Sequence, residues 1–185
     1  MAEEQLEVPS ASEWVTFQAG AAMDFFQGTP QEAQILGSLL ALNMEALDGT
    51  FGNVTDDNQS FRTSFELATR WDQMKSIPRS REYLRGYSWI TTIGPDVTRR
   101  LMLSGVGLER LREAFCDVHV LPNGGVVLRS TPTFAEYDEQ SIRRSADIFK
   151  PVLLPGVTKK TAGWAPDFKR VAYGMDTTEN AEAGD

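Results

Sequence analysis

Two residue types that carry much of enzyme chemistry are almost missing from this chain. Its 185 residues include one cysteine, Cys116, and one histidine, His119. A single cysteine excludes an intramolecular disulfide bond, which fits a protein of a reducing compartment. A metal site built on His119 would need carboxylates and Cys116 to complete it. We therefore expect neither a metal nor any other cofactor.

Long apolar segments are missing as well. No apolar run approaches the ~20 residues that a helix needs to span a bilayer. The first residues, Met1 to Glu7, are acidic and lack the apolar core of a secretory signal. These two absences predict a cytoplasmic protein without a membrane partner.

Positive charge is missing from the first third of the chain. Residues 1–61 contain ten Asp or Glu and no Lys or Arg, whereas residues 62–112 contain ten Lys or Arg and five acids. The formal net charge of the whole chain is −8. An acidic surface repels nucleic acid and attracts basic partners over about one Debye length, ~8–10 Å. We expect no direct nucleic-acid partner, because the basic stretch falls largely on predicted helices that also carry acids.

The acids of the first third are candidates for a surface that binds a basic partner. A simpler interpretation is that they keep the surface soluble, and the sequence leaves both open. The acids that flank or cap expected elements are the best candidates for partner binding: Asp24, Glu32, Asp48, Asp56 and Asp57.

The composition, with 41% hydrophobic and 24% charged residues, is that of one globular domain. We expect a flexible N-terminus over residues 1–12, a single domain over 13–175 and a disordered acidic tail over 176–185. Helices and an antiparallel hairpin, without strict βαβ alternation, indicate an α+β fold: an antiparallel sheet, with a hairpin in the C-terminal half, packed by several helices.

The expected elements follow from apolar periodicity, caps and turn residues. The clearest helix begins after Thr29, where Pro30 and Glu32 complete a capping box, and carries an apolar stripe of Ile35, Leu36, Leu39, Leu42, Ala46 and Leu47. A polar loop should follow over 49–60. The remaining helices are expected at 61–74, 95–103, 108–115 and 139–150, and the strands at 14–17, 87–93, 117–121 and 126–130, the last two joined by a turn at 122–125.

A nucleophile–base pair of Cys116 and His119 is the first enzyme hypothesis to test. Side chains alternate faces along a strand, so positions three apart point to opposite sides. We expect a buried structural cysteine and a histidine on one face of the hairpin, not a catalytic dyad.

Three other motifs have plain structural interpretations. Gly105–Gly107 lacks the third glycine of a dinucleotide-binding loop and is expected to link two helices. Asp56–Asn58 lacks the glycine and the terminal glutamate of a calcium loop. The acids of Glu136–Glu139 lie just before a helix, where they favour the positive end of its dipole. We therefore expect no catalytic residues.

Two aromatic residues, Trp164 and Phe168, lie outside the expected elements. Trp and Phe are frequent interface anchors, so both are candidates for partner binding. They are also typical of a C-terminal segment that packs back on its own core. Both interpretations stay open.

The order of motifs over about residues 86–155 resembles the type VI secretion immunity family, bacterial proteins encoded beside the toxins of a contact-dependent secretion system. The residues that carry the resemblance are Gly86–Pro95 with Trp89, Leu108–Arg112, Val118–Val120, Asn123–Gly125, Thr131-Pro132 and Ile148–Val152. Such families pair a Trp-containing strand that ends in Gly with a late helix that ends in Lys-Pro or Arg-Pro. Here the strand ends in Gly94 and the helix in Lys150-Pro151.

The resemblance implies an immunity protein that binds and neutralises a cognate toxin, a toxin inhibitor in bacterial antagonism. It implies no catalytic residues and no cofactor. Because no signal peptide is expected, the toxin should act in the cytoplasm. A regulatory or adaptor protein with another protein partner is the second hypothesis, and an enzyme with an unrecognised carboxylate site is the third.

Overall fold

A four-stranded antiparallel sheet organises the fold. The computed structural model describes residues 14, 28–56, 62–160 and 171–178. The strand order is β1 (Phe51–Val54), β2 (Ile90–Ile93), β4 (Val126–Arg129) and β3 (Asp117–Val120), and each neighbouring pair is antiparallel. With the helices packed on it, this sheet forms a single α+β domain, as the sequence predicted.

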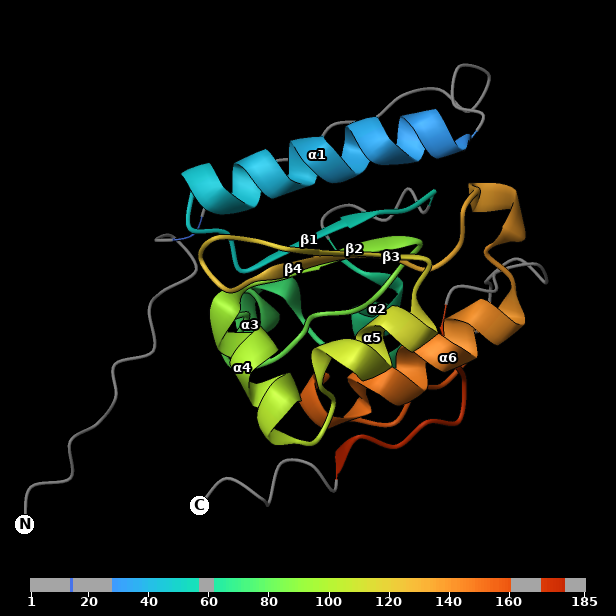
Figure 1. Cartoon of the computed structure of the whole chain (residues 1–185). Helices are drawn as coiled ribbons and strands as arrows, with labels where there is room; N and C mark the ends of the chain where they lie inside the picture. Colours follow the sequence, from blue (N-terminus) through green and yellow to red (C-terminus); the bar gives the residue numbers. More distant parts are fainter. Residues whose placement is uncertain (1–13, 15–27, 57–61, 161–170, 179–185) are drawn as a thin grey trace, which may run out of the picture.

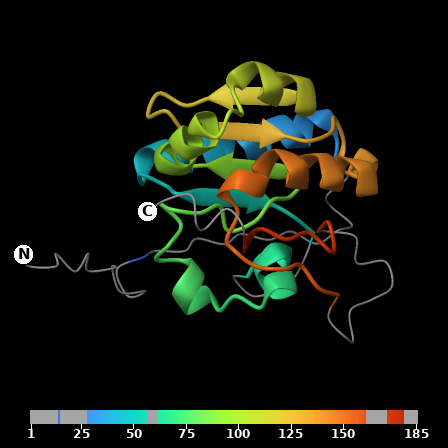
Figure 2. The same ribbon diagram turned by 90° about the horizontal axis from the view of Figure 1, so that it is seen from below.

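The described helices cover the two faces of the sheet unequally (Figure 1). One long helix, α1 (Pro30–Ala46), lies across one face and packs on β1, β2 and β4. Figure 2, seen from below, shows α1 behind the strands and the other helices on the near side. The helices of the other face are α2 (Ser64–Thr69), α3 (Gln73–Ser76), α4 (Pro95–Leu103), α5 (Leu108–Ala114) and α6 (Glu139–Phe149), and two short 3-10 turns lie at Phe134–Glu136 and Lys150–Val152.

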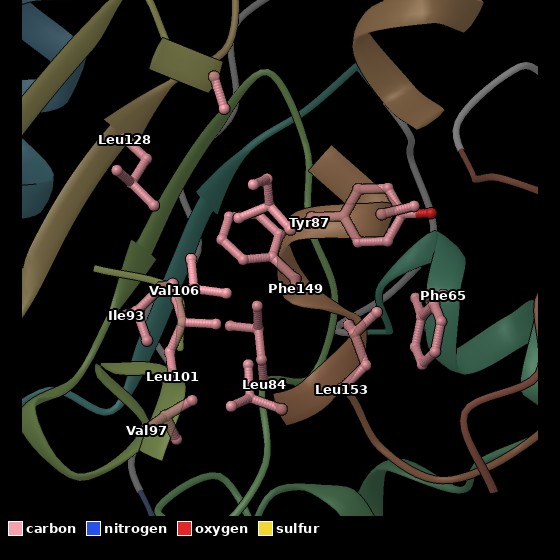
Figure 3. Close-up of a cluster of buried hydrophobic side chains, with 14 of the residues drawn as sticks. Phe65, Leu84, Tyr87, Ile93, Val97, Leu101, Val106, Leu128, Phe149 and Leu153 are labelled. Atoms are coloured by element: carbon pink, nitrogen blue, oxygen red, sulfur yellow. The ribbon is translucent and has the colours of Figure 1, made fainter. Parts of the chain in front are cut away.

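Each face of the sheet carries its own apolar cluster. The larger cluster, between the sheet and α2–α6, includes Phe65 and Phe149, both fully buried (Figure 3). The smaller cluster lies under α1 and contains Trp89 and Ile90. Because side chains alternate along a strand, Ile90 enters the smaller cluster while Ile93 enters the larger one.

The predicted hairpin is confirmed. Val118 pairs with Leu128 and packs against the larger cluster. Val120 pairs with Val126 and so shares that face, but at the end of an edge strand it stays 42% exposed. In the turn, Gly124 has a φ of 88°, a left-handed conformation that glycine adopts without strain.

Two expected elements differ from the structure. The predicted helix over 61–74 is two helices, because Arg70 turns into the left-handed region with a φ of 63° and Asp72 caps α3 by accepting from the backbone N–H of Met74. The strand expected over 87–93 is regular only from Ile90 onward.

The expected polar loop over 49–60 contains β1, an edge strand that pairs with β2. The sequence did not predict β1, because Gly52 and Asn53 in its middle have low strand propensity. Gly52 is needed there: a Cβ at this position would lie 2.6 Å from Oγ1 of Thr92 and 3.2 Å from Leu40. Only glycine lets β1 lie this close to its neighbours.

The ends of the expected domain are only partly described. Trp14 is outside regular structure, and residues 15–17 of the expected first strand lie outside the described residues. Thr177, just inside the expected tail, is buried, and its backbone N–H donates to the carbonyl of Gly156. The domain boundaries stay predictions. None of the described helices is long and apolar enough to cross a membrane.

Candidate protein-binding surface

Helix α1 is apolar on two opposite sides. Its inner side buries Ala33, Ala41 and Met44 against the sheet. Its outer side exposes Ile35, Leu39 and Leu42, at 60%, 51% and 64% of their surface. The exposed Ala46 lies in line with these three, and Leu47, directly after the helix, is 66% exposed. We call Ile35, Leu39, Leu42 and Ala46 the outer stripe.

The sequence grouped these apolar residues into one stripe, but the structure divides them. Trp89 is fully buried under α1, and its ring meets Phe134 edge-on at 5.4 Å. Because the Trp89 ring is large, small residues pack best between it and α1. Helix α1 has Ala33 and Ala41 at these positions. Of the predicted stripe, Leu36 packs partly against this cluster, while the other large residues face outward.

The outer stripe has a clear energetic consequence. Burying a Leu or Ile side chain contributes about 1.5–3 kcal/mol relative to leaving it exposed. The apolar side of a surface helix normally packs against another element, and α1 has a second such side that no described element covers. Grouped exposed apolar residues mark binding sites more often than single ones do. The outer stripe is therefore the strongest candidate for a partner-binding surface among the described residues.

The candidate acids have different environments. The carboxylate of Glu32 belongs to the capping box of α1: it accepts from the backbone N–H of Thr29 at 2.8 Å, and the N–H of Glu32 donates to Oγ1 of Thr29 at 3.3 Å. Asp56 is exposed at the end of β1. Asp24 and Asp57 lie outside the described residues, as do Trp164 and Phe168.

Asp48 is held by an ion pair that the sequence did not indicate. Its carboxylate lies 2.6 Å from a guanidinium nitrogen of Arg81, and the same guanidinium lies 3.3 Å from Asp96. The hydrogen bond that Arg81 donates to the Asp48 carboxylate raises the pKa of Arg81. This pair ties the loop after α1 to the start of α4. Asp48 therefore has a structural contact whether or not it also contacts a partner.

Two arginines of the basic stretch over residues 62–112, Arg79 and Arg100, contact aromatic rings of the protein itself. The Arg79 and Arg100 guanidiniums lie 4.6 and 4.7 Å from the centre of the Tyr83 ring, and Arg79 also lies 5.5 Å from that of Trp71. Cation–π contacts of this kind hold arginines against the surface. Arg79 is further paired with Glu82 at 3.1 Å.

Glu66 and Arg85 form a buried ion pair that the sequence did not indicate. The two side chains are 0% and 9% exposed, and two nitrogens of Arg85 donate to the two carboxylate oxygens at 2.7 and 3.2 Å. The carboxylate also accepts from the backbone N–H of Thr63 at 2.7 Å and from the hydroxyl of Ser76. With its oxygens accepting from all these donors, Glu66 joins α2, α3 and the segment before β2.

Cys116 and His119 were expected not to form a dyad. The Cys116 thiol donates to the backbone carbonyl of Arg129 at 3.3 Å. Contrary to the expectation, Cys116 is exposed, because it precedes an edge strand. Partial burial of the sulfur raises the pKa of the Cys116 thiol, which disfavours the nucleophilic thiolate.

The described part of the chain contains no group of three or more His, Cys, Asp or Glu residues placed to hold a metal ion. In comparisons with known proteins, no family model, curated protein or solved structure matches the chain.

Proposed function

We propose that this protein is an immunity protein, which binds a cognate secreted bacterial toxin in the cytoplasm and neutralises it without catalysing a reaction. The observation that carries a binding function is the outer stripe of α1, where Ile35, Leu39 and Leu42 are all more than half exposed. The resemblance over about residues 86–155 supports a toxin as the partner.

The surroundings of the outer stripe suit tight binding of a basic protein. Large apolar side chains buried at the centre of an interface slow dissociation, and surface charge raises the association rate. Residues 28–56 contain four acids and no Lys or Arg, and one of these acids, Asp48, is paired with Arg81, so the segment that carries the stripe has a negative formal charge. A toxin with a basic surface would therefore be attracted to this side of the protein.

The test begins with the gene beside the coding sequence. If that gene encodes a toxin of a secretion system, the two proteins are produced together and survival of the host cell is measured. We expect the wild-type protein to protect the cell. The variant Leu39→Gln/Leu42→Gln should remain folded by circular dichroism, lose protection and bind the toxin at least tenfold more weakly.

The control is Leu103→Gln, because Leu103 is 82% exposed at the end of α4, on the other side of the sheet. This variant should protect as the wild type does. Full protection by the Leu39→Gln/Leu42→Gln variant would remove the stripe from the interface. A neighbouring metabolic operon, together with no protection against any adjacent gene product, would favour a regulatory or adaptor protein.

A further inference from the structure

We infer that the outer stripe of α1 receives a single helix of the partner, and that this helix has an apolar stripe of the same spacing flanked by Lys or Arg. The inference deepens the proposed function and rests on it for the identity of the surface. It concerns the shape and the charge of the element that docks, which can be measured without the toxin.

The spacing of the outer stripe fits a helix. Ile35, Leu39, Leu42 and Ala46 are separated by four, three and four positions, which is the repeat of the seam between two packed helices. The stripe runs straight along three turns of α1, about 16 Å at the usual helical rise. An apolar stripe of this shape matches the i, i+3, i+4, i+7 anchors of an amphipathic helix.

The side chains beside the stripe determine the charge of the partner. Gln31, Ser38 and Glu45 follow one side of it, and all three are exposed. On the other side, the Asn43 amide donates to the carbonyl of Leu39 at 2.7 Å and so lies along the helix. Glu45 is the charged residue of this border, because Asp48, just after the helix, is already paired with Arg81. Lys or Arg on the incoming helix would complement Glu45.

A second copy of this chain fits the same surface poorly. In an antiparallel pair that places Ile35 against Leu42, Glu45 of each copy lies beside Gln31 of the other, so the border of the stripe forms no salt bridge between copies. Each copy has a formal net charge of −8, so two copies also repel each other. The charge of the chain therefore favours a basic partner over a second copy.

The experiment uses the full chain and designed peptides of about 21 residues, which is three heptads. The first peptide has Leu at the two core positions of each heptad and Lys at the flanking positions. The second has Glu in place of Lys, and the third has the composition of the first in scrambled order. Binding of each labelled peptide is measured by fluorescence anisotropy at low and at physiological salt.

We expect the Lys peptide to bind at least tenfold more tightly than both the Glu peptide and the scrambled one. Leu39→Gln/Leu42→Gln should abolish this preference for the ordered peptide, and Leu103→Gln should leave it unchanged. Equal binding of the ordered and the scrambled Lys peptides, or no binding of either, would overturn the inference. Sedimentation of the chain alone as a dimer that Leu39→Gln/Leu42→Gln dissociates would assign the stripe to a second copy and overturn it too.

The outcomes separate this inference from the proposed function. If the protein protects against its neighbouring toxin but shows no preference for the Lys peptide, the toxin docks by another element and the proposed function stands. If the protein prefers the Lys peptide but does not protect, the surface binds a basic helix and the immunity function is wrong.

Discussion

Arg85 reaches both carboxylate oxygens of Glu66 across 19 positions of the sequence, and the pair is almost completely buried. Its guanidinium also lies 5.6 Å from the centre of the Phe51 ring in β1. One charged contact therefore connects α2 with the segment that leads into β2 and with the edge strand. Because both charges are desolvated, removal of either one leaves the other without compensation.

We expect Glu66→Gln to lower the free energy of unfolding by about 3–5 kcal/mol, because it leaves the Arg85 charge buried without its counter-ion. The measurement is urea unfolding followed by circular dichroism. The control is Glu109→Gln, which breaks a pair with Arg112 whose side chains are 86% and 55% exposed, and should cost about 1 kcal/mol or less. Similar losses of unfolding free energy in both variants would show that the buried pair contributes no more to stability than an exposed pair does.

Tyr87 fixes the C-terminal segment to the core. Its hydroxyl oxygen accepts from the backbone N–H of Ala172 at 2.9 Å, and both residues are buried. Replacement of Tyr87 by Phe would leave that N–H without its acceptor. We expect the free energy of unfolding to fall by about 1–3 kcal/mol. Hydrogen exchange at Ala172 should become faster, and unchanged exchange there would contradict the role of Tyr87.

The burial of Tyr87 should also make the stability of the protein depend on pH. Burial raises the pKa of Tyr87 well above its ordinary value. The folded protein then holds this proton more tightly than the unfolded chain does. The stabilisation is complete below the ordinary pKa, about 10, and is lost as the pH rises beyond it. The pH range to compare is about 9 to 11, on either side of the ordinary tyrosine pKa. Over this range the wild type should lose more free energy of unfolding than Tyr87→Phe, as measured by urea unfolding.

Local motifs predicted the parts of the fold that depend on neighbours in the sequence. The capping box of Thr29 and Glu32 marked the beginning of α1, and the glycines at 124–125 marked the hairpin turn. Both signals arise within four residues of the feature they determine. This is why these elements agree closely with the structure.

The features that sequence reasoning missed depend on distant residues. Arg70 takes a left-handed conformation without the glycine that would mark it, and β1 exists because β2 pairs with it. The outer stripe could be found as apolar residues, but not as exposed ones. Which side of α1 is buried is decided by Trp89, some fifty positions along the chain, and the pairing of Glu66 with Arg85 has the same long-range origin.

The structure refines which acids to neutralise in a test of electrostatic steering. Glu32 and Asp48 have structural contacts, so their loss would also change stability. Glu45 and Asp56 are exposed and lie beside the outer stripe and at the end of β1. Glu45→Gln/Asp56→Asn should slow association with a basic toxin and weaken its salt dependence, with a smaller change in dissociation. Stopped-flow kinetics at two salt concentrations measure both rates, and a wild-type association rate at low salt would leave these acids only a role in solubility.

The two sides of α1 should respond oppositely to substitution if one serves folding and the other binding. Met44 is 3% exposed in the cluster under the helix, and Met44→Ala should lower the free energy of unfolding by about 2–5 kcal/mol. Leu42, 64% exposed, loses little packing in Leu42→Gln, so the change should stay within about 0.5 kcal/mol. Thermal unfolding of the isolated protein compares the stabilities of the two variants. Well below their melting temperatures, Leu42→Gln should bind the cognate toxin more weakly than Met44→Ala does. A large loss of stability in Leu42→Gln would mean that the outer stripe is already packed within the folded chain, and the stripe would then no longer be a free surface for a partner.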